Sequence, residues 1–592
     1  MTWLERGGSI RRMSHTDSPP APPPAHRAGS RIAAARIITG FLQGLAAYGL
    51  WYALEGNAPA AWVLQNPKGF VLLCLLVLLL PLPVLLGLGH MRGRVLAAWT
   101  VLAGLLIILT GSHDLRQNAT GALREPSLPL LLCLPPMLFI AHNLVSAADA
   151  SRRWWPRYGA CFEAAWRAAI QLALGGLFVS AFWGVYHLGG ALFSLIGLEG
   201  LQRVGGKAWF YLPVTGMVAA AALHLADAQD RLTRGMRVLG LTLLGWLTPL
   251  LAVLTACFLL ALLFSGPALL WDTGYAAPLL TVATATLIIL INAVHQDGEA
   301  QSARPLRWAA HLAAVVLPVL VMLAAWGLWL RIDQYGLTRD RVVGVAALVV
   351  LAGYAVPYII AALRPGMRLV EPANIAVAGV VVLVLLALNT PLADPSRLAV
   401  NSQVSRLLAG EVPAEKFDFY FLRYGSGRYG RQALARLQRH DDPAIATAAR
   451  REGGTPGVAG AEAQQPLRLA AYPADAALPP AIRTFMEGQV AYCRGVDCVA
   501  MPLDLAGDGT VSWLVGPAGS AFWLFRQSPE GEWRRAENFS IGNCGRQMLE
   551  AVLAGQLTLE LPREREIVVA GQRLRSRNLA PYCDEEGRRG GG

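Results

Sequence analysis

Several polar side chains lie within long apolar runs, where a polar group is costly and usually serves helix packing or function. Gln171 and His187 are sixteen residues apart in one such run, and Trp183 and Tyr186 lie close to His187. Gln171 and His187 are the best pair to line a polar cavity; the alternative, which we favour, is that each makes a hydrogen bond that packs two helices together. The polar residues in or beside the apolar runs are Gln43, His142, Asn143, Gln171, His187, His224, Asp227, Asn292, His295 and His311.

A second candidate is the Gly-Arg-Tyr-Gly-Arg element at 427–431. Its glycines permit close backbone approach, and Arg428 and Arg431, three residues apart at a helix start, could hold a phosphate or a lipid headgroup. The alternative is a plain helix start, with the arginines paired to acidic residues and Tyr429 packed inward. The acidic candidates are Glu411, Glu415 and Asp418, and a further possibility is a basic face against outer-leaflet headgroups formed by Arg423, Arg428, Arg431, Arg436 and Arg439.

A third candidate is the Asp504–Gly509 segment, which is similar to a calcium-binding loop. Asp504 and Asp508 supply carboxylates, but Ala506 occupies the third position and Val515 occupies the twelfth, where an EF-hand has glutamate. An Asp-Gly turn between two strands explains the segment at lower cost. We therefore expect a turn, with calcium binding at Asp504 and Asp508 as the alternative.

Four cysteines lie after the last apolar run, and they are Cys493, Cys498, Cys544 and Cys583. An even number of cysteines in an exported domain is typical of a disulfide framework. Among three connectivities we favour Cys493–Cys498 with Cys544–Cys583. A four-cysteine zinc site is the alternative, although these spacings do not match the paired C-x2-C knuckles of zinc ribbons.

Composition decides the class of protein that must position these residues. Hydrophobic residues make up 54% of the 592 residues, charged residues make up 15%, and the mean hydropathy is +0.42, which predicts a multi-pass membrane protein. The net charge is +12, and most of the excess lies before residue 396, among the apolar runs; a nucleic-acid-binding protein would carry it on a soluble face. Metalloprotease, hydrolase and P-loop motifs are missing, and we predict no cofactor.

Eleven apolar runs are long enough to cross the roughly 30 Å hydrocarbon core of a bilayer as helices. A shorter piece at 190–198 follows the fifth run, and we predict an interfacial or re-entrant helix there; if 188–199 crossed separately, the number of spans would be even. The predicted spans are 33–54, 69–89, 95–111, 128–146, 164–187, 208–226, 238–265, 275–295, 308–330, 342–363 and 373–392.

The distribution of arginine and lysine predicts the orientation, because cytoplasmic loops carry an excess of both. With the N-terminus in the cytoplasm, the inner segments hold 19 such residues and the outer loops hold 8. An odd number of spans then places the C-terminal part outside the cytoplasm. In a bacterial inner membrane with an outer membrane beyond it, this compartment is the periplasm.

The expected fold is a membrane-spanning all-α bundle followed by a helical juxtamembrane segment and a small soluble α+β module. The module is expected to contain strands at 511–516, 520–525, 557–561 and 566–571 and a helix near 546–553. The predicted divisions are a disordered cytoplasmic tail (1–31), the membrane domain (32–393), the helical segment (394–452), a linker (453–466) and the exported module with its two disulfides (467–592).

A resemblance to a known family is carried by residues 190–204, 400–412 and 417–437, and the Gly-Arg-Tyr-Gly-Arg element is its most specific mark. In these segments the chain resembles the DUF4153 family of bacterial multi-pass membrane proteins. The resemblance implies a multi-pass protein with a helical segment after the last span, and it brings no catalytic residues.

Three classes of function are compatible with these observations. The first, which we favour, is a non-enzymatic envelope protein that anchors the exported module for a protein, lipid or cell-wall partner. The second is a transporter or channel for a small or lipidic solute, although internal repetition, which would favour it, is not evident. The third is an envelope enzyme acting on a lipid-linked substrate.

Overall fold

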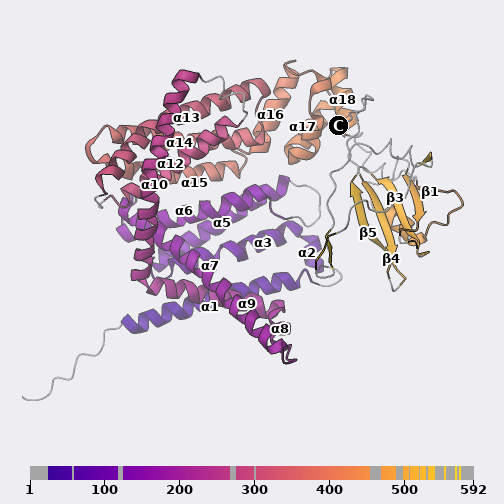
Figure 1. The fold of residues 1–592 in the computed structure, drawn as a ribbon, viewed down its shortest axis with the longest axis horizontal. Coiled ribbons are helices and arrows are strands. Elements are labelled where there is room, and N and C mark those ends of the chain that lie inside the picture. Colours follow the sequence, from indigo (N-terminus) through magenta and orange to yellow (C-terminus); the bar gives the residue numbers. More distant parts are fainter. Residues whose placement is uncertain are drawn as a thin grey trace, which may run out of the picture. The chain divides into compact units, whose positions relative to one another are not determined.

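In a computed structural model, the chain forms two compact units, a helical unit (Met1–Arg436) and a C-terminal unit (Leu437–Gly592). Figure 1 shows the long helices of the first unit and the sheet of the second. The structure describes residues 25–55, 59–117, 125–266, 275–298, 302–453, 469–488, 498–505, 507, 509–518, 521–528, 531–540, 553–554, 567–569 and 572–574.

Among these described residues, eleven helices are long and apolar enough to cross a membrane, in agreement with the predicted number. Two short helices, α2 (Ala61–Gln65) and α8 (Gly200–Gly205), lie in connections. The long helices are α1 (Ala25–Tyr52), α3 with α4 (Pro67–Leu79 and Pro81–Gly87), α5 (Gly93–Gln117), α6 (Leu128–Ser151), α7 (Tyr158–Ser194), α9 (Ala208–Ala228), α10 (Asp230–Ser265), α12 (Ala276–His295), α13 (Arg304–Tyr335), α14 (Arg339–Ala362) and α15 (Val370–Leu388).

Two details differ from the sequence-based expectation. Helix α1 begins at Ala25, inside the segment 1–31 that we expected to be a disordered tail. The piece at 190–198 does not form a separate interfacial or re-entrant helix, because α7 continues without a break to Ser194 and ends in a turn. No helix-breaking residue type stands at His187–Leu188, and the glycines at 189 and 190 are tolerated inside a long helix.

Close packing of α1 on α9 depends on glycine. A Cβ atom added to Gly40 would lie 2.2 Å from the carbonyl oxygen of Gly216, and one added to Gly44 would lie 2.3 Å from that of Leu212. Small residues four apart on one helix allow two backbones to approach in this way. This contact brings the first and sixth long helices side by side (Figure 1).

Two contacts between helix ends show that the long helices alternate in direction. Arg36, near the start of α1, bonds to Asp227 near the end of α9, which requires an even number of passes between them (α1, α3–α4, α5, α6, α7 and α9). His113, near the end of α5, likewise contacts Asp394 just after α15. Helix α7 therefore counts as one pass, and the chain leaves α15 at the end of the bundle opposite to the start of α1.

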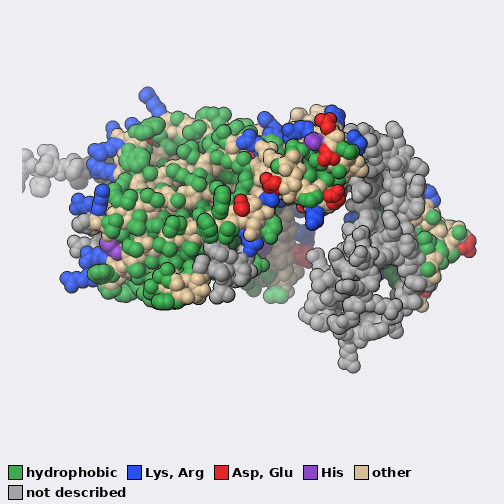
Figure 2. Space-filling view, turned by 90° about the horizontal axis from the view of Figure 1, so that it is seen from above, with side chains coloured by type: hydrophobic (Ala, Val, Ile, Leu, Met, Phe, Trp, Pro, Cys, Tyr) green, Lys and Arg blue, Asp and Glu red, His purple; other side chains and the backbone are tan. Residues whose placement is uncertain are grey.

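Hydrophobic side chains cover the sides of the bundle, and Lys and Arg gather at the end where α1 begins, at the left in Figure 2. Many of the aliphatic side chains that face outward are more than half exposed, for example Leu243, Leu263 and Val101. Inside, one apolar core joins α12, α13 and α14, and another joins α3, α5 and α6. Ala103 and Ile107 of α5 are fully buried.

The segment after α15 is helical, as predicted. It contains α16 (Pro395–Leu408), a π-helical turn at Phe421–Gly425, α17 (Gly427–Leu437) and α18 (Pro443–Gly453). Figure 1 shows α16 and α17 at the end of the bundle where α5 ends. Gly430 lies inside α17, and its missing Cβ atom allows α17 to approach the carbonyl oxygen of Leu422.

The C-terminal unit contains a five-stranded sheet with the order β1-β2-β3-β4-β5, in which only β1 and β2 are parallel. The strands are β1 (Leu469–Ala471), β2 (Cys498–Leu503), β3 (Ser512–Ala518), β4 (Ala521–Gln527) and β5 (Trp533–Ser540). Helix α20 (Pro480–Gly488) covers one face through Ile482 and Met486. A separate hairpin joins β6 (Ile567–Val569) to β7 (Gln572–Leu574).

Three of the predicted strands of this unit are confirmed by β3, β4 and β6, because alternating apolar residues supply the buried face of a sheet. The strand predicted at 557–561 lies outside the described residues, as does nearly all of the helix predicted near 546–553. Strands β1, β2 and β5 and helix α20 were not expected from the sequence.

Candidate functional site: a polar cavity around Asp394

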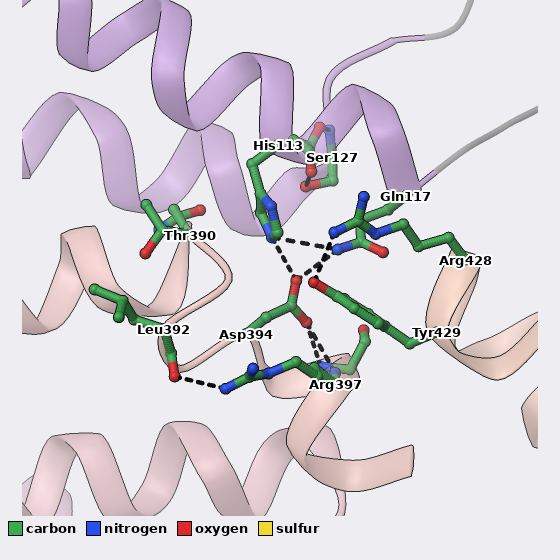
Figure 3. Close-up of polar contacts among 12 residues, drawn as sticks. His113, Gln117, Ser127, Thr390, Leu392, Asp394, Arg397, Arg428 and Tyr429 are labelled. Carbon is green, nitrogen blue, oxygen red and sulfur yellow. Dashed lines mark hydrogen bonds and ion pairs between the residues drawn. The ribbon is translucent and has the colours of Figure 1, made fainter. Parts of the chain in front are cut away.

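The end of the bundle where the chain leaves α15 contains a buried cluster of polar side chains. His113 Nε2 lies 2.6 Å from Oδ2 of Asp394, and Gln117 Nε2 donates to the same oxygen at 2.6 Å. Both His113 and Asp394 are buried, at 7% and 5% exposure. Figure 3 shows these side chains converging from α5 and from the segment before α16.

Asp394 is held in place by the helix that follows it. Its other oxygen, Oδ1, accepts hydrogen bonds from the backbone N–H groups of Ser396 (2.8 Å) and Arg397 (3.0 Å), so Asp394 is the N-cap of α16. An Asp followed by Pro is a common helix start, and the N-terminal end of the helix dipole stabilises the carboxylate. One carboxylate therefore starts a helix and also fixes the orientation of His113.

The Gly-Arg-Tyr-Gly-Arg element packs α17 against the end of α5. Gly427 has φ +58, and a Cβ atom there would lie 3.1 Å from the carbonyl oxygen of Gln117. Arg431 donates to that same oxygen at 2.9 Å, which satisfies a carbonyl at the last residue of α5. Arg428 lies over the ring of Tyr429, 4.7 Å from its centroid, and donates to its hydroxyl at 2.9 Å.

These contacts contradict the predicted pairing with acidic residues, whereas a phosphate or headgroup at Arg428 and Arg431, and a basic face formed with Arg423, Arg436 and Arg439, stay predictions. In the part of the chain that the structure describes, neither Arg428 nor Arg431 pairs with Glu411, Glu415 or Asp418: Glu411 pairs with Arg406, and Asp418 accepts from the backbone of Phe421. The predicted inward packing of Tyr429 has a partial counterpart, because its hydroxyl points towards Gln117 and Asp394 in Figure 3.

A cavity of about 1060 Å³, here called the Asp394 cavity, opens beside this cluster. Five parts of the fold enclose it: the end of α5, the start of α6, the start of α14, the end of α15 with the start of α16, and the π-helical turn with the start of α17. Its polar and charged lining residues include His113, Asp114, Gln117, Glu125, Ser127, Arg339, Asp340, Asn389, Asp394, Ser396, Arg423 and Arg431.

Only part of this lining is available to a ligand. Asp114 is occupied by Ser127, whose backbone N–H and hydroxyl both donate to it, and Ser127 in turn caps α6. Arg339 and Asp340, by contrast, are exposed at the rim and have no side-chain partner among the described residues. The cavity therefore offers charges of both signs and hydrogen-bonding groups, which suits a hydrophilic ligand better than an apolar one.

The opposite end of the bundle contains a second cluster, centred on Asp227. Its Oδ2 accepts from Arg36 at 2.8 Å, and its Oδ1 is 2.7 Å from His90 Nε2 and accepts from Gln171 Nε2 at 2.6 Å. Arg36 is 1% exposed and also donates to the carbonyl oxygen of Leu88. The pocket beside His90 and Gln171 is only about 10 Å³, which leaves little room for a ligand there.

Gln171 and His187 therefore do not form one cavity. Sixteen residues along the unbroken helix α7 separate them by about 24 Å. Gln171 is buried and packs α7 against α9 through Asp227, which is the alternative that we considered. His187 is exposed and lies against the rings of Trp183 and Tyr186.

A third cluster joins four helices near the end where α1 begins. Asn374 Nδ2 donates to Oδ1 of Asn292 at 2.6 Å, and Tyr358 donates to Oδ1 of Asn374 at 2.6 Å. Tyr158 accepts from the same amide nitrogen at 3.2 Å. Every one of these groups has a partner in the cluster, as a buried polar network requires.

The remaining candidates lie in the C-terminal unit. Asp504 accepts backbone hydrogen bonds from Gly507 (2.7 Å) and Gly509 (3.0 Å), the geometry of the expected turn, whereas Asp508 lies outside the described residues. No group of three or more potential metal ligands occurs among the residues that the structure describes. Cys498 is disulfide-bonded, and Cys493, Cys544 and Cys583 lie outside the described residues, so the predicted pairing stays a prediction.

His113 and Asp394 were not predicted from the sequence, because both lie just beyond the ends of predicted spans. The signal for Asp394 was present in the Asp-Pro pair that starts a helix. No local signal pairs it with His113, which is 281 residues away.

In the part of the chain that the structure describes, the fold has eleven long apolar helices, a polar cavity at one end of the helical unit and a separate C-terminal unit. The family model for a domain of unknown function, DUF4153, matches residues 44–437. The chain therefore belongs to the DUF4153 family, which confirms the resemblance. The match ends where the C-terminal unit begins and includes all residues that line the Asp394 cavity. No curated protein and no solved structure matches the chain.

Proposed function

We propose that this chain is a multi-pass protein of the bacterial inner membrane that binds a hydrophilic ligand in the Asp394 cavity, on the periplasmic side, and anchors the C-terminal unit there. The observation that carries the proposal is a cavity of about 1060 Å³ beside a buried His113–Asp394 pair. Burying a carboxylate and an imidazole in the wall of a cavity costs more free energy than burying apolar side chains there. A role in binding a ligand explains why this wall nevertheless contains both groups.

The membrane part of the proposal rests on the outer surface of the bundle and on charge. Exposed aliphatic side chains on the long helices are stable in lipid and unfavourable in water. The end of the bundle where α1 begins is rich in arginine (Figure 2), which favours a cytoplasmic position for that end. Because α15 emerges at the opposite end, the Asp394 cavity then faces the periplasm.

Cysteine labelling in intact cells tests this orientation. Asp340→Cys lies at the rim of the cavity, Ser396→Cys lies inside it, and the control Arg94→Cys is exposed at the opposite end. A small membrane-impermeant methanethiosulfonate should modify the first two in intact cells, and Arg94→Cys only after permeabilisation. The reverse pattern would place the cavity in the cytoplasm and overturn the proposal.

Native mass spectrometry of the full-length protein, extracted in a mild detergent, tests ligand binding. We expect a non-protein mass that is retained by wild type and by Arg94→Gln and lost from Asp394→Asn and from Arg339→Gln. Retention of the same mass by all four proteins would show that it binds elsewhere.

The periplasm is oxidising, so we also propose the disulfides Cys493–Cys498 and Cys544–Cys583 in the C-terminal unit. Non-reducing gels should show faster migration than reducing gels. Cys544→Ser and Cys583→Ser should each abolish the same part of that shift, and an unchanged shift in either variant would refute this pairing.

An envelope enzyme acting on a lipid-linked substrate is the second candidate, because an Asp-oriented histidine can act as a general base. Conversion of the retained compound over time by wild type, and its persistence on Asp394→Asn, would favour the enzyme. Transport has weaker support. Ala103 and Ile107, midway along α5, are buried in an apolar core that lies between the two polar clusters, where a transport path would need space.

A further inference from the structure

A second large hollow lies on the side of the bundle, at the end opposite to the Asp394 cavity. This hollow, here called the α6–α15 groove, has a volume of about 960 Å³ and lies between α6 and α15, with Val95 of α5 beside it. Its walls are almost wholly aliphatic and include Leu144 and Val145 of α6 and Ile375 and Leu383 of α15.

Small residues keep this groove open. Ala141 and Ala148 of α6 and Ala376 and Gly379 of α15 line it, and a Cβ atom added to Gly379 would meet nothing within 4 Å. From Ala141 to the end of α6 the groove extends along eleven residues, about 16 Å of helix. This length is close to half of the roughly 30 Å hydrocarbon core, which is the depth of one leaflet.

The mouth of the groove carries a net positive charge. Arg92 is neutralised by Asp149, whose carboxylate accepts from its Nε at 2.6 Å and from its backbone N–H at 2.8 Å. Arg152 and Arg153 are exposed and, in the part of the chain that the structure describes, have no side-chain partner. The left-handed backbone of Arg152 (φ 50) ends α6 and turns the following residues across the mouth.

Two tryptophans follow the arginines. Trp154 is 99% exposed and Trp155 is 55% exposed, and both line the groove. Tryptophan is enriched at the level of lipid headgroups, where its ring contacts acyl chains and its N–H reaches a polar partner. Exposure of two adjacent indoles beside an aliphatic groove is unfavourable in water and is explained by contact with lipid.

We propose that the α6–α15 groove binds an anionic phospholipid, with an acyl chain along Gly379 and Leu144 and with the phosphate at Arg152 and Arg153. Charge complementarity at one end and an aliphatic wall of one-leaflet length together fit a phospholipid; a peptide segment would need partners for its backbone groups, which the aliphatic walls do not supply. This inference rests on the proposed membrane insertion, with this end of the bundle at the cytoplasmic leaflet.

Native mass spectrometry of the detergent-solubilised full-length protein with added lipid tests the site. The probes are phosphatidylglycerol and phosphatidylcholine with identical acyl chains. Wild type should bind phosphatidylglycerol on the order of tenfold more tightly, and Arg152→Gln/Arg153→Gln should abolish that preference. The matched control Arg304→Gln/Arg307→Gln removes two exposed arginines from the start of α13, near the same end of the bundle, and should keep the preference.

Gly379→Leu tests the groove without changing any charge. The added side chain enters open space and replaces a glycine in a helix, so the fold should be retained while acyl chains are blocked. We expect weaker binding of both lipids. Equal binding of the two lipids by wild type, equal effects of the two arginine pairs, or unchanged binding by Gly379→Leu would each overturn the proposal.

A separate measurement distinguishes failure of the membrane proposal from failure of the lipid-binding proposal. Release of the protein from cell membranes by alkaline carbonate, without detergent, would contradict membrane insertion whatever the lipid titrations show. Retention in the membrane together with no lipid preference would contradict the groove site alone.

Discussion

Asp227 and Asp394 lie near opposite ends of the helical unit, each among polar partners, but of these two carboxylates only Asp394 lines a large polar cavity. Asp227 accepts from Arg36 and Gln171 and lies 2.7 Å from His90, and the pocket beside His90 and Gln171 is only about 10 Å³. Asp394 contacts His113 and caps α16, and it lines a cavity of about 1060 Å³. A packed cluster fixes helices relative to one another, whereas a polar wall around a large space can receive a ligand. The difference assigns a stabilising role to Asp227 and a role in ligand binding to Asp394.

The largest effect on the free energy of unfolding should come from a substitution in the Asp227 cluster. Asp227→Ala leaves the guanidinium of Arg36, which is 1% exposed, without its carboxylate, and we expect a loss of about 3–5 kcal/mol in the free energy of unfolding. Thermal or denaturant unfolding in detergent measures it. The control Glu199→Ala breaks an exposed pair with Arg203 and should cost no more than about 1 kcal/mol. Equal losses would contradict a stabilising role for Asp227.

Substitutions at two glycines with left-handed backbones test the packing of α17 beside the Asp394 cavity. Gly427→Ala and Gly410→Ala should each cost about 1–2 kcal/mol from backbone strain. Only Gly427 is also close to another helix, 3.1 Å from the carbonyl oxygen of Gln117, whereas Gly410 faces open space. Unfolding midpoints should therefore fall further for Gly427→Ala. A matching fall for both would mean that this contact contributes nothing.

Asp394 itself should be less important for stability than Asp227. Asp394→Ala removes the N-cap of α16 and should cost about 1 kcal/mol, while Asp394→Asn keeps a capping side chain and should cost less. Both variants lose the carboxylate that contacts His113, so both should lose the ligand. If Asp394→Asn were as destabilising as Asp227→Ala, the two ends would not differ in the way that we propose.

The smallest effect is expected at Arg431. Arg431→Ala removes a hydrogen bond between an exposed side chain and the last carbonyl of α5, worth about 0.5–1.5 kcal/mol. Arg436→Ala is the matched control, because Arg436 is exposed on the same helix and has no partner among the described residues. A fall in the unfolding midpoint for Arg431→Ala alone would support a stabilising role for this hydrogen bond. Identical midpoints for the two variants would contradict that role.

The existence of the long helices was predictable because a long apolar run is recognisable from neighbouring residues alone. The run 373–392 corresponds to α15, and Asp394-Pro395 follows it with the signal for a new helix. Helix boundaries were less predictable, since the glycines at 189 and 190 suggested a break that the long helix α7 does not make.

The candidate site was predictable only in part. The Gly-Arg-Tyr-Gly-Arg element was recognised, but its contacts were not, because Gly427 and Arg431 act on the end of α5, more than 300 residues earlier. Gln171 was recognised as a buried polar residue, but its partner Asp227 lies on another helix. Local patterns carry no information about which helix ends meet.

The sequence by itself determined the number of long apolar helices, the charge difference between their ends and the family, since each depends on composition along short stretches of chain. Only the tertiary structure decided that His113 contacts Asp394, that Asp227 accepts hydrogen bonds from Arg36 and Gln171, and that Asp394 lines a large cavity. Those outcomes depend on how helices pack, and glycines such as Gly40 and Gly216 set the distances at which two helices can approach.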